Sequence, residues 1–215
     1  MIPFSSRWQD SDSTPNALSE AVASRKKSGQ PIIDLTTSNP TQCGIPCPDW
    51  TPLLNQDSVR NYDPHPQGQF AAREAIAGYY AGRNEKVDAS DLFLTAGTSE
   101  GYAHLFKLLC DPRDEILVSS PSYPLLETLA SLEGIQIRSY CDRKSLEVGI
   151  TESTRAILVV QPNNPTGHVL SMEDASHLVN IAEEKGLALV VDEVFADYLH
   201  GDSRFLSAPL SSGLA

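Results

Sequence analysis

Two kinds of segment alternate along the chain. Short runs rich in apolar residues predict β-strands at 32–35, 92–95, 116–119, 135–140, 156–160 and 187–191. Longer segments with apolar residues at helical spacing predict helices at 16–28, 69–81, 100–109, 122–133 and 171–185. Strands that are apolar throughout are typical of a parallel sheet with helices on both faces. The alternation therefore predicts an α/β protein with three αβα layers and a mostly parallel sheet.

Residues that end helices support this reading. Gly29, Gly82, Gly134 and Gly186 each follow the end of a predicted helix, where glycine most easily adopts the backbone conformation that stops it. Ser122 and Ser171 stand where a side chain can cap the first turn of a helix.

The negative net charge and the lack of long apolar runs disfavour some classes of binding partner. The net charge of the 215-residue chain is −12, from 16 Lys and Arg against 28 Asp and Glu. Nucleic acids and anionic membranes attract clustered positive charge, so both are disfavoured. Residues 1–10 show no charged segment followed by an apolar one, as a secretory signal would, and the longest apolar runs are too short to span a bilayer. We therefore expect a cytoplasmic protein.

The cysteines indicate no metal site. Cys43, Cys47, Cys110 and Cys141 form no CxxC pair, and the loose spacing of the first two lacks the further ligands that a tetrahedral site needs. We expect free thiols, as is usual in a reducing compartment.

A candidate phosphate site follows the predicted strand 92–95. Gly97 permits a tight turn, and the N–H groups and hydroxyls of Thr98 and Ser99 would face an anion at the positive end of a helix. The segment is neither a Walker A loop nor a GxGxxG fingerprint. A plain helix cap explains it equally well when it is taken alone.

Two further strands end in residues that suit a flat ring. Tyr123 follows the strand 116–119 and can stack on an aromatic ligand, although a tyrosine of the core or the surface is the simpler explanation. Asn164 follows the strand 156–160, and its amide can donate to a phenolate oxygen. An ordinary turn is the alternative, because Asn, Pro and Gly dominate turns.

A carboxylate ends the last predicted strand. Asp192 directly follows the run 187–191, and a carboxylate at the mouth of a buried strand needs a positive partner or several donors. A protonated pyridine nitrogen is such a partner, and that protonation is what makes pyridoxal phosphate an electron sink. A helix cap and a structural ion pair remain open as alternatives.

Taken in order, these motifs resemble those of class I/II pyridoxal-phosphate-dependent aminotransferases, which have fold type I. The strings GTS, PSY, NNPTG and DEVF follow one another as in that family, and the segments 62–68 and 72–76 are similar to its tyrosine-to-glycine segment and the helix after it. The resemblance covers roughly residues 30 to 200. It implies a cofactor-binding set made of Gly97, Thr98, Ser99, Tyr123, Asn164 and Asp192.

The resemblance assigns each of these residues a role. Residues 97–99 bind the phosphate, Tyr123 stacks on the pyridine ring, Asn164 bonds the ring hydroxyl oxygen and Asp192 pairs with the ring nitrogen. Tyr62 reaches the phosphate of the other subunit's cofactor, which implies a homodimer, and Asn39 lies where the family meets the substrate carboxylate.

The resemblance also divides the chain and marks two peptide bonds. Residues 1–45 are expected to form an N-terminal arm and small-domain segment, and residues 46–215 a pyridoxal-phosphate-binding large domain that is cut short at its C-terminal end. Ser120–Pro121 and Asn164–Pro165 are candidates for cis peptide bonds.

The chain departs from the family pattern in two respects. Phe195 stands where a tyrosine is usual, which removes one donor to the ring oxygen. In the family, the Schiff-base lysine follows the aspartate by one further strand and loop, so we expect it beyond Ala215. The six lysines of the chain do not replace it, and we expect no catalytic residue here and an inactive fragment.

The resemblance implies an amino-acid aminotransferase, which moves an amino group between an amino acid and a 2-oxo acid through pyridoxal 5′-phosphate. A fold type I C–S lyase or another lyase of that kind would use the same motifs. A non-catalytic binding or regulatory module could retain the fold without the chemistry. A nucleotide or sugar-phosphate binder would explain the loop at Gly97 but not Asn164 and Asp192.

Overall fold

The structure is a computed structural model that describes residues 5, 7, 15–34, 39–55, 60–83 and 85–199. The chain divides into two compact units, with Asp10–Pro64 in the smaller and Met1–Gln9 and His65–Ala215 in the larger. The predicted domain boundary after residue 45 stays a prediction.

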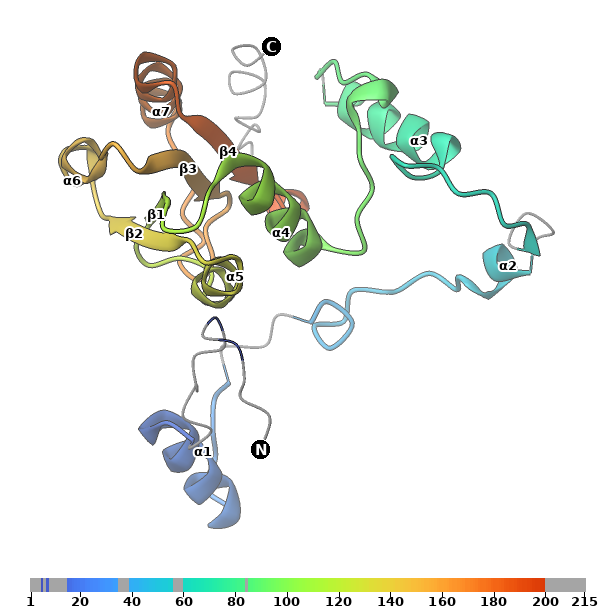
Figure 1. The fold of residues 1–215 in the computed structure, drawn as a ribbon. Coiled ribbons are helices and arrows are strands. Elements are labelled where there is room, and N and C mark those ends of the chain that lie inside the picture. Colours follow the sequence, from blue (N-terminus) through green and yellow to red (C-terminus); the bar gives the residue numbers. More distant parts are fainter. Residues whose placement is uncertain are drawn as a thin grey trace. The chain divides into compact units, whose positions relative to one another are not determined.

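The larger unit is built on a parallel sheet (Figure 1). Its strands are β1 (Glu115–Ser119), β2 (Gln136–Tyr140), β3 (Thr154–Val160) and β4 (Ala188–Asp192). They follow the order β2-β1-β3-β4, and every neighbouring pair is parallel. The register sets Val118 beside Leu158 and Val160 beside Asp192, so the carboxyl ends of these strands lie at one edge.

Helices cover both faces of the sheet, which confirms the three predicted layers (Figure 1). On one face lie α4 (Thr98–Leu109) and α5 (Leu125–Glu133), and on the other lie α6 (Arg143–Gly149) and α7 (Met172–Lys185). Successive side chains of a strand point to opposite faces of the sheet. Ile116 packs on the side of α4 and α5, whereas its neighbour Leu117 packs on the side of α6 and α7. Both side chains are 0% exposed, which explains why successive positions of β1 are apolar.

Local signals place most helix ends. Asn16 caps α1 (Ala17–Lys27) and Ser171 caps α7, each by accepting a hydrogen bond from a backbone N–H in the first turn. Gly134 and Gly186 end α5 and α7 in the left-handed conformation, at φ 78° and 65°. The predicted helix 69–81 is α3 (Phe70–Ala81), which ends at Gly82.

Two predicted strands are wrong within the described residues. Residues 32–34 and 92–95 form no ladder there, because no described strand pairs with their backbone groups; Leu35 lies outside the described residues. The predicted cap at Ser122 is also wrong. The N-cap of α5 is Pro124, and the hydroxyl of Ser122 is buried without a partner in the described part of the chain.

Several short elements were not predicted. The helix α6 begins at a capping box in which Asp142 and Ser145 each accept from the other's backbone N–H. The remaining short elements are α2 (Thr51–Leu54), η2 (Ala89–Asp91) and η3 (Ala196–Tyr198). Elements of three to seven residues carry too little periodicity to be recognised by pattern alone.

The structure bears out two smaller predictions. Ser120–Pro121 and Asn164–Pro165 are cis, and so is Gln161–Pro162. The four cysteines are not joined in disulfides. Over the described ranges, no group of His, Cys, Asp or Glu could hold a metal ion, and no helix is long and apolar enough to cross a membrane.

Candidate functional site

The carboxyl ends of β1, β3 and β4 define the candidate site. Ser119, Val160 and Asp192 end these strands, and parallel strands bring such ends to one edge of a sheet. The N–H of Gln161 donates to the carbonyl oxygen of Asp192 at 2.8 Å, which links the ends of β3 and β4. The loops that follow these strands therefore leave from the same edge.

The loop at Gly97 presents backbone donors. In the described part of the chain, the N–H groups of Thr98 and Ser99 have no acceptor, as expected for the first residues of a helix. A Cβ atom built on Gly97 would meet nothing within 4 Å, so the space before the helix is open. The N–H of Ala96 is already used, because it donates to Glu100 Oε2 at 2.6 Å. The donors left for an anion are those of Thr98 and Ser99.

A hydrogen bond connects the helix after this loop with the carboxylate of β4. The phenol of Tyr102, which is 4% exposed, donates to Asp192 Oδ2. Burial, together with this bond, raises the pKa of Tyr102 above its ordinary value, so the phenol keeps its proton and acts as the donor. Tyr102 lies four residues beyond Thr98, roughly 6 Å along the helix. The first turns of α4 and the end of β4 are thus neighbours.

Tyr123 lies close to this pair. It is partly buried and packs against the hydrophobic cluster that contains Tyr102. Electrostatic repulsion between the ionised forms of the two phenols is the smallest of the causes that raise the pKa of Tyr102, as expected when two phenols are close together. The neighbouring Ser122 hydroxyl is a buried polar atom for which the described residues offer no hydrogen-bond partner.

The two adjacent asparagines after β3 differ in their contacts. Asn163 Nδ2 donates to the carbonyl oxygen of Pro121 at 3.0 Å and to Thr166 Oγ1 at 2.8 Å, so Asn163 joins the loops after β1 and β3. The side chain of Asn164 is half-buried and makes no hydrogen bond with the residues that the structure describes. Its amide is therefore available to a ligand.

Tyr62 and Asn39 belong to the smaller unit. Tyr62 is 93% exposed and lies outside any helix or strand. Asn39 Oδ1 accepts from the N–H and the hydroxyl of Thr41, at 3.1 and 2.7 Å, and so forms a local turn. Their assigned roles stay predictions, as do those of the residues around the sheet edge.

Five of the six lysines lie on helices. Lys107 on α4 forms an ion pair with Glu133, and Lys185 at the end of α7 pairs with Glu184 at 2.7 Å. Lys26 and Lys27 are in the last turn of α1, where the negative end of the helix dipole stabilises positive charge.

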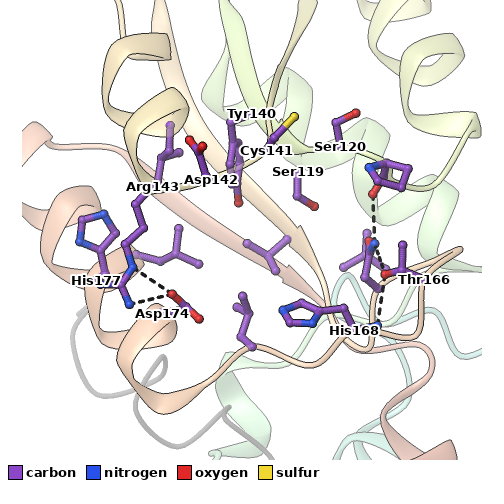
Figure 2. A pocket seen from close by; sticks show the side chains of 17 residues that line it. Ser119, Ser120, Tyr140, Cys141, Asp142, Arg143, Thr166, His168, Asp174 and His177 are labelled. Carbon is purple, nitrogen blue, oxygen red and sulfur yellow. Dashed lines mark hydrogen bonds and ion pairs between the residues drawn. The ribbon is translucent and has the colours of Figure 1, made fainter.

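A cavity opens beside the edge that carries the candidate site, on the α6 and α7 face of the sheet (Figure 2). It has a volume of about 380 Å³ and is bounded by the ends of β1 and β2, the two helices and the turn 163–168. Arg143 lines it and donates to Asp174 Oδ1 from Nε at 2.9 Å and from Nη2 at 2.7 Å. Of the residues predicted to bind the cofactor, none lines this cavity.

Neither Tyr102 nor the orphaned hydroxyl of Ser122 was predicted from the sequence as part of the site. Tyr102 and Phe106 are four residues apart on an apolar helix face, which is the pattern of ordinary core residues. Nothing local indicates that the phenol meets Asp192, which is 90 positions away.

Comparison with known proteins defines the class. Residues 30–213 match the family described as "Aminotransferase class I and II". The chain belongs to this family, whose members use pyridoxal 5′-phosphate.

The relatives include several aminotransferases. Over 206 residues the chain is 32% identical to the glutamate-pyruvate aminotransferase AlaA of Escherichia coli K12, a match that covers 88% of this chain and 50% of the relative. It is 32% identical over 196 residues to an alanine aminotransferase of Mycobacterium tuberculosis H37Rv, covering 83% and 45%.

Solved structures agree in fold. An aminotransferase from Escherichia coli superposes with a TM-score of 0.81 at 28% identity, covering 98% of this chain and 56% of that one. The alanine aminotransferase of Pyrococcus furiosus superposes with a TM-score of 0.75 at 27% identity, covering 90% and 52%. The chain thus spans about half the length of the relatives it matches. Its fold class is that of the fold type I aminotransferases.

Proposed function

We propose that this chain provides the cofactor-binding region of an amino-acid aminotransferase and holds pyridoxal 5′-phosphate between the Gly97 loop and Asp192. The observation that carries the proposal is the hydrogen bond from Tyr102 to Asp192. It brings the helix that begins at the loop next to the strand-end carboxylate, so one elongated ligand can contact both.

The phosphate end has suitable donors. The N–H groups of Thr98 and Ser99 lack acceptors among the described residues, and they lie at the positive end of the α4 dipole. Their hydroxyls add two further donors. An anion there would satisfy backbone groups that are otherwise left to water.

The ring end has a suitable acceptor and a suitable donor. The carboxylate of Asp192 would favour the protonated form of a pyridine nitrogen. The amide of Asn164 would donate to the ring hydroxyl oxygen, and the ring of Tyr123 would stack on the pyridine face. When bound, pyridoxal phosphate supplies an electron sink that stabilises negative charge at the α-carbon of an amino acid. The chain's own residues bind the cofactor, orient its ring and hold the proton at its nitrogen.

The substrates follow from the names of the relatives. The relatives are named glutamate-pyruvate, alanine and tyrosine aminotransferases. These names support the proposal that the substrates here are an amino acid and a 2-oxo acid. We extend the proposal to a cytoplasmic homodimer, in which Tyr62 reaches the partner subunit's cofactor phosphate and Asn39 meets the substrate carboxylate.

The binding proposal can be tested with pyridoxamine 5′-phosphate, because this form of the cofactor needs no lysine. We expect the chain to bind it, as measured by quenching of protein fluorescence, and to bind pyridoxamine without the phosphate far more weakly. Asp192→Ala should lower the affinity about tenfold or more, the effect of one hydrogen bond to a charged group. Asp111→Ala, in the exposed loop before β1, is the matched control and should bind normally. Equal affinity of D192A and the unchanged chain would refute the assignment of Asp192.

A further inference from the structure

Tyr102 is held rigidly by the core. It is 4% exposed and packs against Phe106, which is 1% exposed, with ring centroids 5.8 Å apart. Phe106 and Tyr102 belong to the hydrophobic cluster between α4, α5 and the sheet. A ring packed in this way has one position for its hydroxyl, so the donor that reaches Asp192 is fixed in space.

Both oxygens of Asp192 have one donor each. Oδ1 accepts from the N–H of Val194 at 2.9 Å, and Oδ2 accepts from the phenol of Tyr102. These two bonds define the rotation of the carboxylate. A carboxylate oxygen can accept a second hydrogen bond, so each oxygen retains an acceptor site. The half-buried Asp192 can therefore receive a third donor without breaking the other two.

We infer that Tyr102 is a positioning residue, whose hydroxyl orients Asp192 for contact with the protonated ring nitrogen of pyridoxal phosphate. The inference rests on the proposed function and deepens it. A carboxylate that is already oriented loses less conformational freedom when a ligand binds. Removal of the phenolic hydroxyl should therefore weaken recognition of the ring nitrogen more than recognition of the phosphate.

The competing explanation is a core tyrosine whose hydroxyl merely needs a partner. Burial of an unpaired hydroxyl is unfavourable, so the bond to Asp192 would satisfy it in any case. The two explanations differ in one measurable respect. A purely structural tyrosine affects the binding of all cofactor analogues alike, whereas a positioning tyrosine affects those that carry the ring nitrogen.

The test compares two ligands on four proteins. The ligands are pyridoxamine 5′-phosphate and its analogue in which a C–H group replaces the ring nitrogen. The proteins are the unchanged chain, Tyr102→Phe, Asp192→Ala and the control Tyr140→Phe, which removes the hydroxyl of a half-buried tyrosine at the end of β2. The quantity measured is the ratio of the two dissociation constants, so that a general loss of affinity cancels.

The unchanged chain should prefer the nitrogen-containing ligand by about tenfold or more, as expected for one charge-assisted hydrogen bond. Y102F should reduce this preference at least threefold, D192A should abolish it, and Y140F should retain it. If the unchanged chain shows no preference, the proposed function is wrong. If Y102F retains the full preference, with or without a uniform loss of affinity, the inference about Tyr102 is wrong and the proposed function stands.

A second measurement covers the case in which Y102F does not fold. Proton NMR of the unchanged chain should show a slowly exchanging phenolic hydroxyl resonance, shifted downfield by the charged acceptor, that disappears in D192A. Absence of this resonance, or its persistence in D192A, would overturn the inference without any need for the Tyr102 variant.

Discussion

Arg138 on β2 donates two hydrogen bonds to Glu115 on the neighbouring strand β1, from Nε to Oε2 at 3.1 Å and from Nη2 to Oε1 at 2.8 Å. The hydroxyl of Thr151 adds a third donor to Oε2 at 2.8 Å. The hydrogen bonds from Arg138 lower the pKa of Glu115, and burial opposes them. This ion pair lies at the amino end of the sheet, opposite to the edge where the candidate site lies.

The ion pair predicts a pH-dependent contribution to stability. A carboxyl whose pKa is lowered by folding stabilises the folded state above its unfolded pKa of about 4.3, and this stabilisation is lost as the pH falls through the folded value. Glu115→Gln should therefore lower the free energy of unfolding by about 1–3 kcal/mol at pH 7 and by less at pH 3.5. Urea unfolding at both pH values measures the difference. Glu152→Gln, at an exposed position, is the control and should change the free energy of unfolding little. If the effect of E115Q did not depend on pH, the ion pair between Glu115 and Arg138 would not be its cause.

Gly68 cannot be replaced without a clash. Its φ is +90°, and a Cβ atom there would lie 2.7 Å from the Cβ, Cγ and Cδ1 atoms of Leu94. Gly68→Ala combines backbone strain with overpacking and should lower stability by about 2–4 kcal/mol. Gly186→Ala is the control for strain alone, since its φ is +65° but nothing lies within 4 Å. Thermal unfolding should show a clearly larger loss for G68A, and equal losses would mean that the contact with Leu94 is unimportant.

The cap of α7 should contribute measurably. Ser171 Oγ accepts from the N–H of Asp174 at 3.1 Å, which satisfies one of the free donors of the first turn. Ser171→Ala should lower the free energy of unfolding by about 1 kcal/mol. Ser176→Ala, at an exposed position inside the same helix, should be neutral or slightly stabilising because alanine has the higher helix propensity. A ranking of the two variants in the opposite order in urea unfolding would argue against the cap.

Substitution of the two asparagines after β3 should have different effects: one should lower stability and the other should weaken ligand binding. Asn163→Ala loses the bonds to Pro121 and Thr166 and should cost about 1–3 kcal/mol of stability. Asn164→Ala should leave stability within about 0.5 kcal/mol but weaken the binding of pyridoxamine 5′-phosphate about tenfold. Unfolding curves and ligand titrations of both variants provide the check. If N164A binds normally, the predicted contact with the ring oxygen is absent.

The thiols should differ in reactivity. Burial, followed by the negative charge of Asp114, raises the pKa of Cys110. The thiolate is the reactive form, so iodoacetamide should label Cys110 more slowly than the exposed Cys141 at neutral pH. The rates should converge when the chain is unfolded in urea. A Cys110 that reacts as fast as Cys141 in the folded chain would contradict its placement beside the core.

The sequence predicted the elements that are long and regular. The helices α1, α3, α5 and α7 have spacing and end residues that local rules recognise, and β1, β3 and β4 each contain an apolar run. The segments 32–34 and 92–95 were predicted as strands because an apolar run satisfies the same rule. A strand exists only when a neighbouring strand pairs with its backbone, and no described strand pairs with these segments; the N–H of Leu94 donates only to the carbonyl oxygen of Gln67, which lies outside any strand.

By itself the sequence determined the family, the layered α/β architecture and the residues that stand at the strand ends, because periodicity and motif order are properties of neighbouring positions. The tertiary structure alone decided which of these ends meet. The phenol of Tyr102 and the carboxylate of Asp192 are 90 positions apart, and only the packing of α4 against the sheet brings them into hydrogen-bonding contact. Such a contact depends on the summed burial of many side chains, so no local pattern encodes it.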